Sequence, residues 1–225
     1  MTTTPTTTAG RATVMATSNR AVIGFIAAVL VAVLAGCGMA ATSQQVRDKA
    51  AGTVAPGSGT TAVPPVRGLA VRPAPAGWRR AVLPGGLAVL AYPPAMHLVG
   101  GDPGTVSAAQ FSSSGGYLMY LNATPRQGAE SLRNWPVFRL QHLLDDDASA
   151  ARLLAESRGV SFARGTGSCV VDTYVTKIHR HHYTELACYV QGRTSASVII
   201  AAAPTAGGVT LPGALTRAVG AYQVR

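Results

Sequence analysis

Three of the five histidines fall within four residues, in the run His179-Arg180-His181-His182. Imidazole nitrogens are common ligands of zinc and copper, so His179, His181 and His182 are the candidates for a metal site. However, Arg180 and the nearby Lys177 would oppose a bound cation, and no cysteine or carboxylate stands at ligand spacing. We therefore favour a solvated turn between two strands over a metal site, and we predict no cofactor.

Two carboxylates, Asp172 and Glu185, are expected on the same outward face of a hairpin. Paired carboxylates can perform acid–base catalysis, but these two are too few to favour it over plain solvation. The run Gly165-Thr166-Gly167-Ser168 has the glycines of a phosphate loop, but it lacks the lysine and precedes a strand instead of a helix. The chain has no Gly-x-Ser-x-Gly motif. The sequence therefore predicts no catalytic residue and favours a protein that is not an enzyme.

A long apolar run, Ala21–Leu34, follows Arg20 and ends in small residues. This is the layout of an export signal, and the run is short for a membrane-spanning helix. Its end, Leu34-Ala35-Gly36-Cys37, resembles the lipobox of bacterial lipoproteins. The resemblance implies removal of residues 1–36 as a signal peptide and lipidation of Cys37 with diacylglycerol and acyl chains such as palmitate.

Two alternatives stay open at the N-terminus. The small residues up to Ala41 bring the apolar run close to spanning length, so an uncleaved signal anchor is the rival of the lipid anchor. The first 19 residues are rich in Thr, and a start at Met15 would give a more ordinary export signal than a start at Met1.

The remaining cysteines, Cys169 and Cys188, form an even pair once Cys37 is assigned to the lipobox. Exported proteins fold in oxidising compartments, where such a pair can bridge. Two antiparallel strands with Cys169 opposite Cys188 would also place Thr173 opposite Thr184. We predict this disulfide, and buried free thiols in any other register.

The composition of the chain distinguishes a spacer, residues 37–76, from a folded domain, residues 77–225. Residues 37–76 contain many prolines, glycines and threonines without hydrophobic periodicity, which predicts a disordered tether. Residues 77–225 are long enough for one domain. The formal charge of +10 comes from scattered arginines without a basic stripe, which argues against a nucleic-acid partner.

Short strands begin the domain: 79–83 and 87–92 form a hairpin around Pro84-Gly85-Gly86, and 105–112 and 117–123 follow. Helical spacing then predicts helices over 136–145 and 148–157, with Asp145-Asp146-Asp147 at the start of the second. A calcium loop is the alternative for these aspartates, but a closing Glu is missing. Later strands are expected over 160–163, 169–178, 183–191 and 194–203, and a closing helix over 211–224.

This order predicts an α+β domain with an antiparallel sheet and packed helices, arranged like an α/β/α sandwich. It resembles the PsbP/Mog1 group in element order and in the Tyr92-Pro93 that follows an early strand. An N-terminal apolar helix and the tether would precede this domain.

The sequence thus favours a membrane-anchored lipoprotein whose non-catalytic domain binds or scaffolds on the extracytoplasmic side. Its expected partners are the membrane, through lipid or the apolar helix, and an envelope protein or cell-wall component. The alternative function is a signal-anchored surface enzyme, either a hydrolase or a metal-dependent enzyme.

Overall fold

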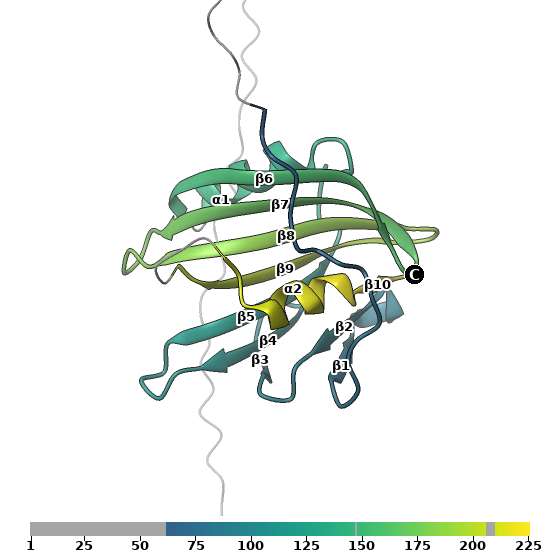
Figure 1. The fold of residues 1–225 in the computed structure, drawn as a ribbon, viewed down its shortest axis with the longest axis horizontal. Helices are drawn as coiled ribbons and strands as arrows, with labels where there is room; N and C mark the ends of the chain where they lie inside the picture. The colour runs from purple at the N-terminus through teal and green to yellow at the C-terminus, as the bar shows by residue number, and fades with distance from the viewer. Residues whose placement is uncertain (1–61, 147, 206–209) are drawn as a thin grey trace, which may run out of the picture. The chain divides into compact units, whose positions relative to one another are not determined.

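The computed structural model describes residues 62–146, 148–205 and 210–225, which form a sheet-rich α+β fold with two antiparallel sheets and two helices (Figure 1). The expected signal, the lipobox with Cys37, and both candidate start residues lie outside the described residues. Within the described part of the chain, neither helix is long and apolar enough to cross a membrane.

The larger sheet has seven strands, and every neighbouring pair is antiparallel. The order across the sheet is β3-β4-β5-β9-β8-β7-β6. The strands are β3 (His97–Val99), β4 (Val106–Phe111), β5 (Tyr117–Pro125), β6 (Ala148–Phe162), β7 (Gly165–Thr176), β8 (His182–Gly192) and β9 (Ala196–Pro204).

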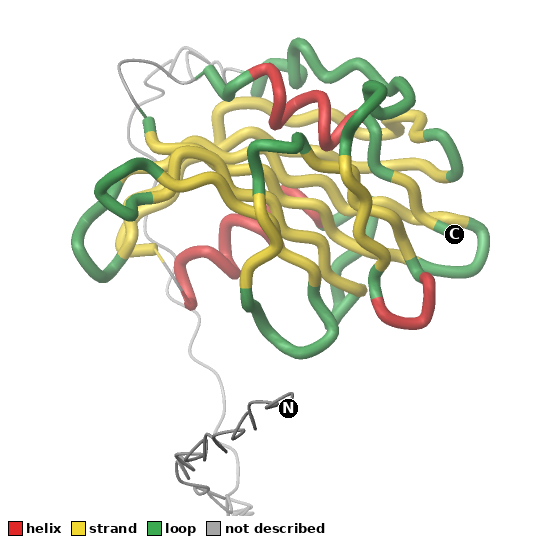
Figure 2. Tube along the Cα trace, turned by 90° about the horizontal axis from the view of Figure 1, so that it is seen from below, coloured by secondary structure: helices red, strands yellow, loops and turns green. Residues whose placement is uncertain are grey.

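Each helix covers a different face of this sheet. Alternate residues of a strand point to opposite faces. Helix α1 (Trp135–Asp146) packs through Trp135 on the face of Val170 and Ala187, whereas helix α2 (Gly213–Gly220) packs on the face of Cys169 and Cys188. Figure 2 shows the strands running between the two helices. The larger cluster of buried apolar side chains lies on the α2 side.

A three-stranded sheet joins the two ends of the domain. Strand β2 (Ala88–Tyr92) pairs with β1 (Arg79–Val82) on one side and β10 (Gln223–Val224) on the other. The turn between β1 and β2 is the short 3-10 helix η1 (Pro84–Gly86), with Gly85 and Gly86 at positive φ. The predicted hairpin around these glycines is therefore confirmed.

Cys169 and Cys188 form a disulfide between β7 and β8. The two cysteines are directly opposite one another, and Thr173 is opposite Thr184 in the same ladder. Both the bridge and the predicted register are confirmed. Both cysteines are fully buried, on the apolar face that α2 covers.

The predicted helix over 148–157 is wrong, because these residues belong to β6, the longest strand and an edge of the sheet. Alanine and leucine favour a helix intrinsically, but pairing with β7 along the whole strand overrides this weak preference. The closing helix is confirmed only as Gly213–Gly220, since the chain then turns into β10. Helix α1 begins one residue before the predicted Pro136.

The last part of the expected tether packs on the domain. Val66, Leu69 and Val71 contact the main apolar cluster. The backbone NH of Glu156 in β6 donates to the carbonyl of Pro64, and the NH of Arg72 donates to the carbonyl of Gly220. These apolar side chains are spaced irregularly, so the sequence pattern did not reveal that this segment lies across a sheet face.

Candidate ligand-binding cleft

The turn between β7 and β8 is built around Thr176. Its hydroxyl donates to the carbonyl of Ile178 at 2.6 Å and accepts from the NH of His181 at 3.0 Å. His179 and Arg180 adopt positive φ values of 61° and 54°, which non-glycine residues rarely do. Thr176 therefore stabilises a tight, left-handed turn that presents the histidines at the end of the hairpin.

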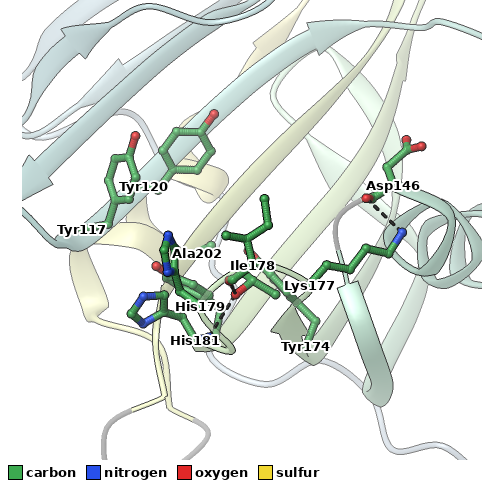
Figure 3. Close-up of a pocket in the computed structure, with 11 residues that line it drawn as sticks. Tyr117, Tyr120, Asp146, Tyr174, Lys177, Ile178, His179, His181 and Ala202 are labelled. Carbon is green, nitrogen blue, oxygen red and sulfur yellow. Dashed lines mark hydrogen bonds between the residues drawn. The ribbon is translucent and has the colours of Figure 1, made fainter.

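Lys177 links this turn to helix α1. Its ammonium group donates to the carbonyls of Asp145 and Asp146 at 2.7 and 3.0 Å. Carbonyls at a helix C-terminus lack helical partners and carry the negative end of the helix dipole, so a lysine is favourable there. The lysine thus fixes one wall of the cavity that lies beside the turn (Figure 3).

The structure brings together only two of the three candidate histidines. The rings of His179 and His181 are 5.9 Å apart, and both line the cavity. His182 begins β8, where its position next to Tyr183 directs its side chain to the opposite face. No group of three histidine, cysteine, aspartate or glutamate side chains suited to a metal occurs among the described residues.

Four tyrosines from three strands face the same cavity. Tyr174 and Tyr183 are cross-strand partners in β7 and β8, with ring centroids 5.5 Å apart and planes nearly parallel. Tyr117 and Tyr120 in β5 form an edge-to-face pair at 5.6 Å. Burial raises the pKa of Tyr174 and Tyr183, so these hydroxyls stay protonated and able to donate.

The resulting cavity, which we call the tyrosine cleft, has a volume of about 530 Å³. Ala202 in β9 lies between the strands of the tyrosines, and its small side chain leaves room above the sheet. In Figure 3, Tyr117 and Tyr120 lie above His179 and His181, and Lys177 extends away from them to Asp146. The full lining is Tyr117, Tyr120, Asp146, Tyr174, Thr176, Lys177, Ile178, His179, His181, Tyr183 and Ala202.

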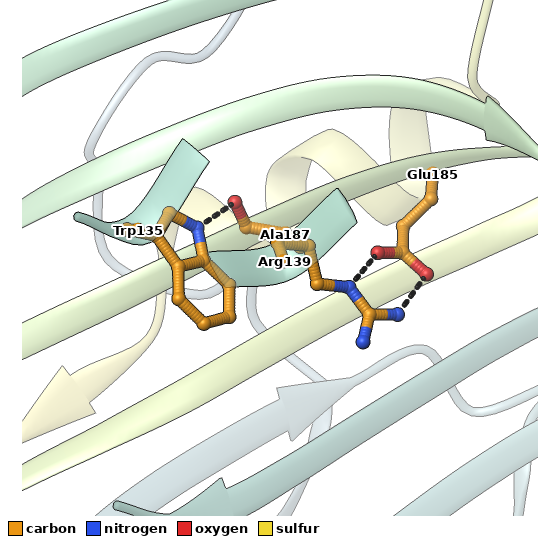
Figure 4. Close-up of polar contacts among 4 residues, drawn as sticks. All are labelled: Trp135, Arg139, Glu185 and Ala187. Atoms are coloured by element: carbon orange, nitrogen blue, oxygen red, sulfur yellow. Dashed lines mark hydrogen bonds and ion pairs between the residues drawn. The ribbon is translucent and has the colours of Figure 1, made fainter. Parts of the chain in front are cut away.

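A second cavity of about 210 Å³ shares Tyr120 and Tyr174 with the tyrosine cleft and extends beneath α1. Arg139 of α1 and Glu185 of β8 line it and form a buried, bidentate ion pair at 2.6 and 2.7 Å. Trp135, one turn earlier in α1, donates its indole NH to the carbonyl of Ala187 at 3.0 Å (Figure 4). These contacts attach α1 to β8, next to the cleft.

Asp172 is fully buried opposite Glu185, and neither of its carboxylate oxygens has a hydrogen-bond partner. Burial, with repulsion from Glu185, raises the pKa of Asp172 to about 8 against the opposing attraction of Arg139. The sequence placed Asp172 and Glu185 correctly on one face, but their expected solvation is wrong because α1 covers them. Asp172 lines neither the tyrosine cleft nor the second cavity, so its carboxyl group would not contact a ligand bound in either of them.

Sequence reasoning missed the tyrosines as a site, because they are spread from residue 117 to residue 183. One signal was present. The predicted register that pairs Cys169 with Cys188 also pairs Tyr174 with Tyr183, and tyrosines on one face of adjacent strands form a continuous aromatic surface. Arg139 gave no comparable signal, because its partner lies 46 residues away.

Comparisons with known proteins leave the family open. No protein-family model matches the chain, and no curated protein matches it. Among solved structures, the chain is similar to a Bacteroides thetaiotaomicron protein with 14% sequence identity and a TM-score of 0.41. That match covers 65% of this chain and 48% of the Bacteroides chain, so this chain spans about half of that protein's length.

Proposed function

We propose that this protein is a lipid-anchored component of a bacterial cell envelope, with its domain on the extracytoplasmic side. The support is the apolar run that ends in Leu34-Ala35-Gly36-Cys37. The disulfide between Cys169 and Cys188 agrees with this location, because structural disulfides persist in oxidising compartments. Cys37 would carry the acyl chains.

The domain would bind its ligand without chemical conversion, in the tyrosine cleft. The observation that carries this proposal is the convergence of four tyrosines and two histidines on one open cavity. Most of the charged groups beside the cavity are already engaged: Lys177 with the end of α1, and Arg139 with Glu185. Such a site offers flat ring faces with hydroxyls and imidazoles as hydrogen-bonding groups, which suits recognition of a ligand.

The ligand we assign to the cleft is a saccharide unit of an envelope polysaccharide. Sugar rings present weakly polar faces that can lie on tyrosine rings, and their hydroxyls can pair with tyrosine hydroxyls and imidazoles. A volume of about 530 Å³ is within the range of small-molecule sites. An envelope protein that inserts an aromatic side chain would use the same ring faces, and it is the competing outcome of the test.

Binding of purified envelope polysaccharide to the detergent-extracted protein tests the proposal. Tyr117 is 41% exposed, so Tyr117→Ala removes a lining ring with little effect on folding. We expect this variant to bind roughly tenfold or more weakly, as is typical of a central contact residue. Leu98→Ala, at an exposed position on β3, is the control. Equal binding by wild type and Tyr117→Ala, or binding only to envelope protein, rejects a polysaccharide ligand.

The anchor is tested separately, by the mass of the N-terminal peptide from the membrane fraction. A peptide that begins at Cys37 and carries diacylglycerol is the expected result. An unmodified Cys37 with the preceding residues retained would instead establish a signal anchor, the arrangement that belongs to the alternative of a surface enzyme.

A further inference from the structure

A cavity at the other end of the sheet is lined by three arginines and a threonine, Arg164, Arg193, Arg225 and Thr194, with a volume of about 460 Å³. Strand β7 begins at Gly165, next to Arg164 of this cavity, and ends at Thr176, which lines the tyrosine cleft. The two cavities therefore lie at opposite ends of this strand. Twelve residues of extended chain separate the two cavities by roughly 35 Å. This arginine site is therefore distinct from the tyrosine cleft.

The three arginines come from three separate segments. Arg164 is in the tight turn between β6 and β7, where Phe162 pairs with Gly165. Arg193 and Thr194 form the turn between β8 and β9, which is closed by a hydrogen bond from the NH of Gly192 to the carbonyl of Ser195. Arg225 follows β10, and Figure 1 shows this end of the chain beside the two turns.

Backbone contacts hold these segments against one another. The NH of Arg225 donates to the carbonyl of Leu87, and the Ser195 hydroxyl donates to the carbonyls of Leu87 and Arg225. A Cβ added at Gly165 would meet the carbonyl of Gln191, and one added at Gly192 would meet the carbonyl of Arg225. Glycine at both positions is thus what allows the three segments to lie in direct contact.

The charged side chains that line this cavity are all positive. None of its lining residues is acidic, and none of the ion pairs among the described residues involves Arg164, Arg193 or Arg225. The Arg225 guanidinium lies over Gly86, whose missing side chain leaves it room. Guanidinium groups bind phosphate through paired, charge-assisted hydrogen bonds, and the Thr194 hydroxyl adds a further donor.

We propose that the arginine site binds a phosphate group of a ligand. A tetrahedral dianion would accept from guanidinium groups approaching from three segments, an arrangement that a single surface arginine cannot provide. The cavity is larger than one phosphate needs, so the phosphate would belong to a larger molecule or to a headgroup at a lipid surface. This inference is independent of the tyrosine cleft and of the anchor.

Calorimetric titration of the detergent-extracted protein with inorganic pyrophosphate is the first arm of the test. The second arm measures binding to phosphatidylglycerol vesicles, with phosphatidylcholine vesicles as the neutral reference. Binding of pyrophosphate alone indicates a soluble phosphorylated ligand, and binding of phosphatidylglycerol vesicles indicates a headgroup. Either result supports the site, provided that the binding weakens with added salt and depends on the arginines.

Arg193→Gln removes one charge from an exposed turn and keeps a polar side chain. We expect roughly tenfold weaker binding from this variant, and a further loss from Arg164→Gln combined with it. Arg152→Gln, an exposed arginine of β6 outside the cavity, is the matched control and should bind like wild type. Equal loss in Arg193→Gln and Arg152→Gln, or no binding of either probe by wild type, overturns the proposal.

Discussion

Asp172 and Glu185 lie directly opposite one another on β7 and β8, and helix α1 covers both. Glu185 has Arg139 as its partner, whereas Asp172 has no hydrogen-bond partner. Three ionisable groups therefore share one buried space, with a single positive charge for two carboxyl groups. This imbalance makes the stability of the domain dependent on pH.

The unfolding free energy should fall as the pH rises from about 4 to about 8. The unfolded chain loses the Asp172 proton near pH 4, whereas the folded protein keeps it until about pH 8. The folded state thus binds more protons in this window, and each pH unit within it lowers stability, with a plateau above pH 8. Asp172→Asn should abolish this decline and be more stable than wild type at pH 8.5 by a few kcal/mol.

Urea unfolding at pH 5 and pH 8.5 measures the effect of Asp172→Asn. The exposed carboxylate variant Asp102→Asn is the control and should retain the pH dependence of the wild type. An identical pH dependence in wild type and Asp172→Asn would show that Asp172 is ionised in the folded protein at neutral pH.

Replacing only one partner of the ion pair between Arg139 and Glu185 should lower the unfolding free energy strongly. Arg139→Met leaves the Glu185 carboxylate buried without its partner, and we expect a loss of about 3–5 kcal/mol of unfolding free energy. The double variant Arg139→Met/Glu185→Leu should recover much of this loss, because no buried charge is left over. Arg133→Met, whose side chain is exposed just before α1, should be close to neutral. Urea unfolding of the four proteins gives the comparison, and a double variant no more stable than Arg139→Met would contradict the prediction.

The disulfide should contribute about 3 kcal/mol to the unfolding free energy, since it closes a loop of 19 residues in the unfolded chain. The variant Cys169→Ala/Cys188→Ala should lose this amount, and a reducing agent should lower the stability of the wild type but not that of the variant. Unfolding in urea with and without the reductant separates the two proteins. A variant that unfolds at the urea concentration of the oxidised wild type would contradict the prediction.

Gly220 should be intolerant of a side chain. A Cβ at this position would meet the carbonyl of Ala70, where the N-terminal segment crosses the end of α2. Gly220→Ala should therefore release residues 66–72, which would appear as faster tryptic cleavage after Arg67. Alanine ordinarily favours a helix over glycine, so Gly213→Ala in the same helix, with open space around its Cβ, should be neutral or stabilising. Equal cleavage rates in the two variants would refute the predicted contact.

Local patterns in the sequence predicted those parts of the fold that depend on neighbours in the chain. Strict alternation and the two cysteines gave the β7–β8 register, and the spacing of Trp135, Phe138 and Leu143 gave α1. Strand β6 was mistaken for a helix, because its composition favours a helix while its conformation depends on pairing with β7.

The sites depend on contacts between distant residues, and this is why sequence reasoning found little of them. The histidine run is visible in the sequence, but only His179 and His181 line the cleft, together with tyrosines from β5, β7 and β8. Burial of Glu185 depends on Arg139, which arrives from a helix that precedes β6. The arginine site requires two hairpin turns and the strand β10 to meet, which no local pattern expresses.

The attachment of residues 64–72 has a mechanical consequence for a domain held at its N-terminus. A pull transmitted from an anchor at Cys37 would first load the hydrogen bonds that Pro64, Val66 and Arg72 make with β6 and α2. These few bonds can open one after another while the disulfide-bridged strands stay intact. Detaching this segment would lengthen the chain between the anchor and the domain by about 30 Å, at about 3.3 Å per residue. The segment would thus extend under force before the rest of the folded domain bears any load.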